Sequence, residues 1–125
     1  MIYGLGTDLV DVERIAEKIK RSEGFKELIF SAAEIDYCEA KTHRFEHYAA
    51  RFAAKEAFFK ALGTGWLSGT AFNQIQITHN TDGRPALELS AETKATIAAI
   101  GEFNIHVSLS HTKTVATATV ILETR

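Results

Sequence analysis

The sequence has little of what would fix this chain to a membrane, a disulfide scaffold or a nucleic acid. The single cysteine, Cys38, cannot form an intrachain disulfide, and the single proline leaves no proline-rich linker. No apolar run approaches the length that crosses a bilayer, and the first twenty residues carry charges where a signal peptide is apolar. A net charge of −2 provides no overall attraction for a polyanion. We expect a cytoplasmic chain with an inert thiol and no membrane or nucleic-acid partner.

The composition indicates one folded α+β domain. A chain of 125 residues with 46% hydrophobic and 24% charged residues is typical of a globular domain with a single core, spanning residues 1–125. Helical patterns dominate the first half and alternating strand patterns the second. We therefore expect antiparallel strands packed against helices.

Local patterns predict each element and its end signals. Gly4 and Gly6 interrupt a strand-like start, which fits a backbone that approaches another segment closely. Ser31 and Glu34 have the spacing of a helical capping box. The expected helices cover residues 12–21, 31–41, 44–62 (closed by Gly63) and a short stretch from Ser90 towards Gly101; the expected hairpins pair 72–79 with 85–89 and 104–110 with 114–122.

Glu56 is the least expected residue of the long helix. The apolar stripe Phe45, Tyr48, Ala49, Phe52 and Phe59 places this carboxylate where a hydrophobic residue would be usual. An ionised carboxylate there needs a cation or a hydrogen-bond partner. Lys60, four residues further on, is one explanation, and a metal ion is the other.

Asp8 is a second isolated acid, between a predicted strand and a predicted helix. It either caps that helix or, together with Glu56, holds Mg²⁺, which typically takes one or two carboxylates and fills its shell with water and phosphate oxygens. Basic side chains at Arg51, Lys55 and Lys60 either bind phosphates or solvate the helix surface. A separate basic stripe on the first helix consists of Arg14, Lys18 and Arg21.

Three segments carry a family resemblance when they are taken together. They are YGLGTDLVDVERI near the start, RFAAKEAFFKALGTG in the middle and VSLSHTKTVATATV near the end. In order and spacing they closely resemble the holo-[acyl-carrier-protein] synthase group of 4′-phosphopantetheinyl transferases. The likeness extends over essentially the whole chain, and the middle segment is the most diagnostic.

The resemblance implies an activity and assigns residues to it. The reaction is Mg²⁺-dependent transfer of 4′-phosphopantetheine from coenzyme A to a serine of apo acyl carrier protein, in support of fatty acid biosynthesis. Asp8 and Glu56 become the metal ligands, and Lys60 stands beside the pyrophosphate. A metal-bound water or Glu34 is a possible base. The remaining implied coenzyme contacts are Arg51, Lys55, Gly63, Thr64, Arg84, Pro85 and His111, and the implied carrier-protein contacts are Arg14, Lys18 and Arg21.

The resemblance also implies a homotrimer with active sites between subunits, which periodicity alone does not indicate. Two other functions stay open at this point. One is a Mg²⁺-dependent phosphohydrolase of coenzyme A or a nucleotide. The other is a non-catalytic coenzyme A-binding module, in which Glu56 pairs with Lys60 and Asp8 caps a helix.

Overall fold

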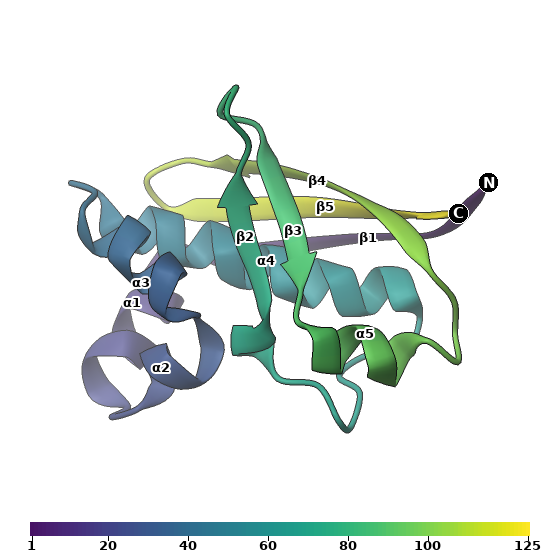
Figure 1. Cartoon of the computed structure of the whole chain (residues 1–125). Helices are drawn as coiled ribbons and strands as arrows, with labels where there is room; N and C mark the ends of the chain where they lie inside the picture. Colours follow the sequence, from purple (N-terminus) through teal and green to yellow (C-terminus); the bar gives the residue numbers. More distant parts are fainter.

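The computed structural model describes all of residues 1–125 as one α+β fold (Figure 1). The helices are α1 (Val12–Arg21), α2 (Phe25–Ile29), α3 (Ala32–Glu39), α4 (Arg44–Leu62) and α5 (Ala91–Ile97), with a short 3₁₀ helix at Phe72–Gln74. The strands are β1 (Ile2–Asp11), β2 (Ile75–His79), β3 (Pro85–Leu89), β4 (Phe103–His111) and β5 (Val115–Thr124). All predicted elements are present, and only α2 and the 3₁₀ helix were not expected. No helix is both long and apolar enough to span a bilayer.

Two antiparallel sheets enclose the long helix. The strand order β1-β5-β4 forms the larger sheet, and β2 pairs with β3 in a separate hairpin. Helix α4 lies between them, with the larger sheet on one side and the hairpin on the other (Figure 1). Strand β1 therefore joins the same sheet as β4 and β5. This places the N-terminal segment with Gly4, Gly6 and Asp8 against α4.

The predicted end signals are confirmed by hydrogen bonds. Ser31 caps α3 in a capping box, because its Oγ accepts from Glu34 N at 3.2 Å and its own N donates to Glu34 Oε1 at 3.0 Å. Ser90 caps α5 by accepting from Thr93 N at 3.1 Å. Gly63 ends α4 with φ +82°, a left-handed conformation that favours glycine.

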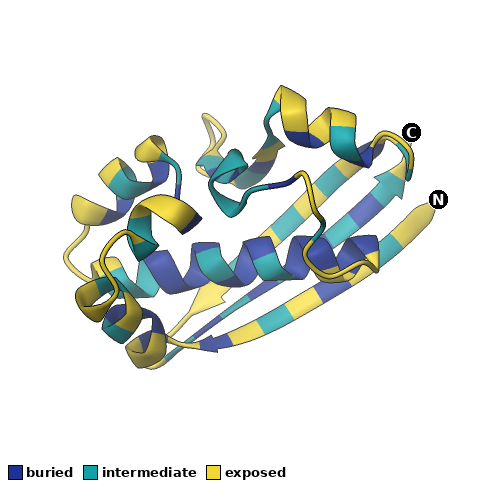
Figure 2. Cartoon of the chain, turned by 90° about the horizontal axis from the view of Figure 1, so that it is seen from below, coloured by how far each residue is buried: buried dark blue, intermediate teal, exposed yellow.

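The predicted apolar stripe of α4 packs in the core, but burial extends beyond it over most of the circumference of the helix. Its alanines and Phe58 are fully buried, as Figure 2 shows along the helix. Phe52 and Glu56 are only half-buried, whereas Lys55 is completely buried. Since sheet and hairpin cover opposite sides of α4, both sides must pack. The ionisable residues of α4 that lie in the core are therefore Arg51 and Lys55, and Glu56 lies nearer the surface.

Strand β1 packs against α4 without intervening side chains. A Cβ atom at Gly4 would overlap the carbonyl oxygen of Ala61, and one at Gly6 would overlap that of Ala57. The close approach expected from these two glycines is thus confirmed, and its partner is α4. Because side chains alternate along a strand, Asp8 shares the helix-facing side with Gly4 and Gly6.

We expect Gly6→Ala to destabilise the fold by about 1–3 kcal/mol, because the added methyl group must push β1 away from α4. Urea denaturation followed by circular dichroism measures this change. Glu23→Ala, at an exposed position between α1 and α2, is the control and should leave the midpoint unchanged. Equal midpoints for both variants would contradict the close packing.

Candidate active site

Asp8 and Glu56 come together in one cavity. Asp8 projects from β1 and Glu56 from α4, and both line a hollow of about 180 Å³. Burial raises the pKa of Glu56, and the nearby charge of Asp8 raises it further. The two carboxylates come from segments far apart in the sequence, yet they are close enough for the charge of Asp8 to raise the pKa of Glu56.

Lys60 pairs with Asp8 and not with Glu56. Its Nζ lies 3.0 Å from Asp8 Oδ1 and donates to the carbonyl oxygen of Thr7 at 3.0 Å. The surface pair between Glu56 and Lys60 is absent. The capping explanation of Asp8 is also wrong, because Asp8 lies within β1 and α1 begins after Asp11. The two non-catalytic explanations of these acids therefore do not apply.

The chemistry of this pair fits a hard divalent cation. No group of three or more His, Cys, Asp or Glu side chains is placed to hold a metal ion. A site with two carboxylates suits Mg²⁺, which keeps several waters and commonly takes substrate phosphates as further ligands. A cation between Asp8 and Glu56 would also favour the ionised form of Glu56, whose pKa is raised in its absence.

Lys55 is committed to the core, which corrects its predicted role as a coenzyme contact. Its Nζ donates to Glu34 Oε1 at 2.6 Å, to the carbonyl oxygen of Phe72 at 2.8 Å and to that of Ile75 at 2.5 Å. An ammonium group has three donors, so none is left for a phosphate. Burial lowers the pKa of Lys55, and the charge of Glu34 opposes this shift.

Glu34 is equally occupied, so it does not fit the alternative role of base. Besides the Lys55 ammonium, its carboxylate accepts from the backbone N–H groups of Ser31 at 3.0 Å and Ile77 at 2.9 Å. Both side chains of the ion pair are fully covered. The pair joins α3, α4 and β2 inside the molecule, and neither side chain is exposed to solvent.

Arg51 and His111 belong to a second group of residues, which we call the Tyr37 cluster: Tyr37, His47, Arg51, His79 and His111. The Arg51 guanidinium lies 4.1 Å from the centroid of the Tyr37 ring, which also stacks on His79 at 4.9 Å. Arg51 is only 2% exposed, and its Nε has no hydrogen-bond partner. Burial lowers the pKa of His47, and the positive charges of His111 and Arg51 lower it further. The cluster is thus a cationic, aromatic region.

The other predicted coenzyme contacts lie in turns. Gly63 and Thr64 follow the end of α4, and Thr64 Oγ1 donates to the carbonyl oxygen of Gly65 at 2.8 Å. Arg84 and Pro85 lie where the β2–β3 turn enters β3, and Arg84 forms an exposed 3.7 Å ion pair within that turn. None of these four residues lines the cavity of Asp8 and Glu56.

The basic stripe of α1 borders the carboxylate cavity. Arg14 and Lys18 line it directly. Arg21 lies one turn further along, and its Nε contacts Glu17 at 2.7 Å. The predicted carrier-protein contacts therefore begin at the cavity and continue onto the open surface of α1.

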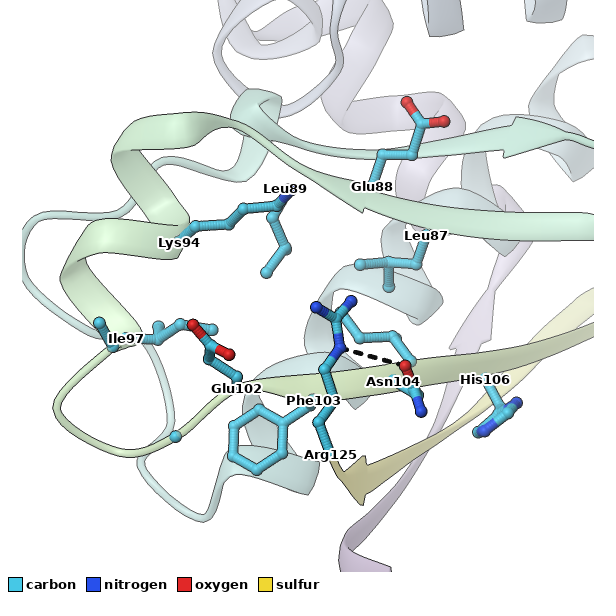
Figure 3. Close-up of a pocket in the computed structure, with 13 residues that line it drawn as sticks. Leu87, Glu88, Leu89, Lys94, Ile97, Glu102, Phe103, Asn104, His106 and Arg125 are labelled. Carbon is cyan, nitrogen blue, oxygen red and sulfur yellow. Dashed lines mark hydrogen bonds between the residues drawn. The ribbon is translucent and has the colours of Figure 1, made fainter.

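A larger cavity of about 650 Å³ lies between β3, α5 and β4 (Figure 3). Apolar residues such as Leu87 and Phe103 line it together with charged side chains, among them Lys94, Glu102 and Arg125. None of the predicted site residues lines it. Two acids, Glu88 and Glu102, line it as well, but neither lies in the segments that carry the family resemblance, so the smaller cavity with Asp8 and Glu56 is the stronger candidate for catalysis.

Cys38 plays no part in either cavity. Its thiol is buried, and burial raises its pKa to about 12. The thiol therefore stays protonated near neutral pH, as expected for an inert cysteine.

Comparison with known proteins identifies the family. The model of the 4′-phosphopantetheinyl transferase superfamily matches residues 4–119. A holo-[acyl-carrier-protein] synthase of Cytophaga hutchinsonii is 46% identical over 123 residues, which cover 97% of this chain and 97% of the relative. The chain belongs to the holo-[acyl-carrier-protein] synthase group of the 4′-phosphopantetheinyl transferase superfamily.

Solved structures of other synthases have the same fold. The holo-[acyl-carrier-protein] synthase of Neisseria meningitidis matches with a TM-score of 0.88 and 32% identity, covering 98% of this chain and 99% of its own. The synthase of Bacillus anthracis, crystallised in complex with CoA (3′,5′-ADP), matches with a TM-score of 0.82 and 33% identity, covering 100% of this chain and 99% of its own. This synthase-type chain therefore has the complete fold of the group.

Three pairs were not expected from the sequence: Lys60 with Asp8, Lys55 with Glu34, and His111 with Glu46. The capping box of Glu34 and its possible role as a base do not point to Lys55, and nothing in the spacing links the two residues. Glu46, which contacts His111 Nδ1 at 2.9 Å, was not singled out either. The one sequence signal for such pairs is an ionisable residue on a helix face that must pack, and it does not identify the partner.

We expect Lys55→Met to lower the free energy of unfolding by about 3–5 kcal/mol, because Glu34 would then be buried without its partner. Chemical denaturation of the wild type and the variant measures the loss. The matched double variant Glu34→Gln/Lys55→Met should recover much of it. A single variant as stable as the wild type would show that the pair is not enclosed as described.

Proposed function

We propose that this chain transfers 4′-phosphopantetheine from coenzyme A to a serine of apo acyl carrier protein and releases adenosine 3′,5′-bisphosphate. The holo acyl carrier protein that it produces would serve fatty acid biosynthesis. The observation that carries the proposal is the meeting of Asp8 and Glu56 in one cavity, in a chain of the synthase group. The attacking hydroxyl belongs to the carrier protein, which is why the cavity needs no nucleophile of its own.

Asp8 and Glu56 would hold Mg²⁺ between β1 and α4. The chemistry supplied by the bound ion is charge neutralisation at the pyrophosphate of coenzyme A. The two carboxylates differ in their surroundings, because Asp8 already has Lys60 at 3.0 Å whereas Glu56 has no ion-pair partner. Glu56 therefore depends more strongly on the cation for its charge to be balanced.

Lys60 is positioned to contact the leaving phosphate. It is about half-exposed, and its ammonium group is held at the edge of the cavity by Asp8 and the carbonyl oxygen of Thr7. With two of its three donors directed inwards, one remains for a phosphate oxygen. Lys60 thus both balances the charge of Asp8 and presents a positive charge to the substrate.

The predicted residues fall into two groups that one chain does not bring together. Arg51 and Glu56 are five positions apart on α4, about 140° around the helix at about 3.6 residues per turn. Glu56 faces the carboxylate cavity, whereas Arg51 is covered by Tyr37. An active site between subunits resolves this division, because the Tyr37 cluster of one chain can complete the carboxylate cavity of the next. We therefore include the homotrimer in the proposal.

The outer face of the larger sheet provides a surface for that assembly. Leu5 and Leu9 of β1 point away from α4, and they are 63% and 72% exposed. In the antiparallel register they lie beside Ile121 and Thr117 of β5, and no other element of the chain covers this face. An uncovered sheet face with large apolar residues is typical of a protein interface.

The basic stripe of α1 would receive the carrier protein. Arg14 and Lys18 line the carboxylate cavity, and Arg21 continues the positive charge outwards. A carrier protein with an acidic surface would be attracted along this stripe towards the cavity. Such contacts chiefly raise the association rate and weaken with salt.

Intact-protein mass spectrometry tests the reaction. Apo acyl carrier protein incubated with this chain, coenzyme A and Mg²⁺ should gain the mass of one phosphopantetheine group. We expect no gain with a chelator, and a loss of at least about 100-fold in rate for Glu56→Gln, which keeps the shape and removes the charged ligand. Breakdown of coenzyme A without any gain on several folded carrier proteins would instead indicate a phosphohydrolase.

Arg21→Glu should raise the KM for the carrier protein several-fold at low salt, with the KM for coenzyme A unchanged. The difference should shrink as the salt concentration rises. Lys94→Glu, on α5 beside the larger cavity, makes the same change in net charge and is the matched control. Equal effects of the two reversals would show that α1 is not the docking surface.

Sedimentation equilibrium should give three chains per particle for the wild type. Leu5→Arg should yield monomers that are folded and inactive, since it places charge on the uncovered sheet face. Leu28→Arg alters a residue of α2 that is similarly exposed, and it should leave the trimer intact. A fully active monomer would contradict the shared active site.

A further inference from the structure

A carboxylate and an imidazole from distant parts of the chain meet at the start of α4. His111 Nδ1, at the end of β4, lies 2.9 Å from Glu46 Oε1 in the first turn of α4. The side chain of Glu46 is 15% exposed and that of His111 is 32% exposed. A carboxylate oxygen only accepts hydrogen bonds, so the proton of this contact sits on Nδ1.

The plane of the His111 ring is held by a second contact. The His47 ring meets it edge-on, with centroids 5.1 Å apart and an interplanar angle of 64°. One contact fixes the direction of Nδ1 and the other limits rotation about it. Nε2 forms no hydrogen bond within the chain and is the nitrogen left for a ligand.

We infer that Glu46 is a positioning residue, which orients His111 so that Nε2–H faces an anionic group of coenzyme A. The inference rests on the proposed function, because that function gives His111 an anionic ligand. A carboxylate that accepts from Nδ1 fixes the direction of the ring, and Nε2 of the imidazolium form can then donate to a phosphate. Glu46 itself does not touch the substrate.

The Glu46 carboxylate is surrounded mainly by positively charged and histidine side chains. His111, Arg51 and Lys41 place positive charge around His47, and Glu46 opposes their effect on it. Glu46 is thus the negative group among these positive neighbours. His43 Nδ1 lies 3.9 Å from the other oxygen of Glu46, which is too far for a hydrogen bond. Glu46 therefore acts mainly on His111.

Coenzyme A affinity is the first test, measured by isothermal titration calorimetry without carrier protein and as KM in the transfer assay. We expect Glu46→Gln to weaken coenzyme binding roughly 3- to 10-fold, because a neutral acceptor replaces a charged one, and to change kcat less than about two-fold. His43→Gln alters the neighbouring histidine and should bind coenzyme A as the wild type does. The double variant Glu46→Ala/His111→Ala should be no weaker than His111→Ala alone.

Nitrogen NMR of the histidine rings gives a readout that does not depend on activity. In the wild type without coenzyme A, Nδ1 of the neutral His111 ring should carry the proton, and Nε2 should be protonated as well when the ring is charged; in Glu46→Ala the neutral ring should be a mixture of the two tautomers. Unchanged tautomers in Glu46→Ala would overturn the inference. So would a loss of coenzyme affinity in His111→Ala but not in Glu46→Gln, although the transferase function would stand. If the wild type transfers nothing to the carrier protein, the proposed function and this inference both fail.

Discussion

The direct packing of β1 against α4 is the constraint on which the site depends. Gly4 and Gly6 let the strand backbone touch the carbonyl oxygens of Ala57 and Ala61, where any side chain would hold the two elements apart. Once β1 is at this distance, the alternation of the strand directs Asp8 towards the helix. The cavity of Asp8 and Glu56 follows from backbone contact, since neither acid is linked to the other by a side-chain bond.

The opposite side of α4 is fixed by charge. The buried pair of Lys55 with Glu34 links the helix, α3, the 3₁₀ helix and the start of β2 through four hydrogen bonds. A buried ion pair contributes little net stability compared with apolar packing, but it tolerates few alternative arrangements. The helix is thus held by close backbone contact on one side and by hydrogen bonds on the other. Adjacent residues of α4 can then have different roles: Lys55 forms the buried ion pair, and Glu56 lines the carboxylate cavity.

Much of the fold could be predicted from the sequence, because local signals determine it. Periodicity and caps gave the bounds of α1 and α4 and the starts of α3 and α5, and the two glycines indicated the close approach. The pairs at the sites could not be predicted in this way. Lys55 with Glu34, Lys60 with Asp8, and His111 with Glu46 are separated by 21, 52 and 65 positions. Such partners are determined by tertiary packing. The helical periodicity around Glu56 gives no information about contacts with distant segments.

Binding of Mg²⁺ in the presence of coenzyme A, without carrier protein, tests the central claim most directly. Isothermal titration calorimetry should give one ion per active site for the wild type and no measurable binding for either Asp8→Asn or Glu56→Gln, because each acid supplies one of only two protein ligands. If either variant bound Mg²⁺ as the wild type does, Asp8 and Glu56 would not form one metal site.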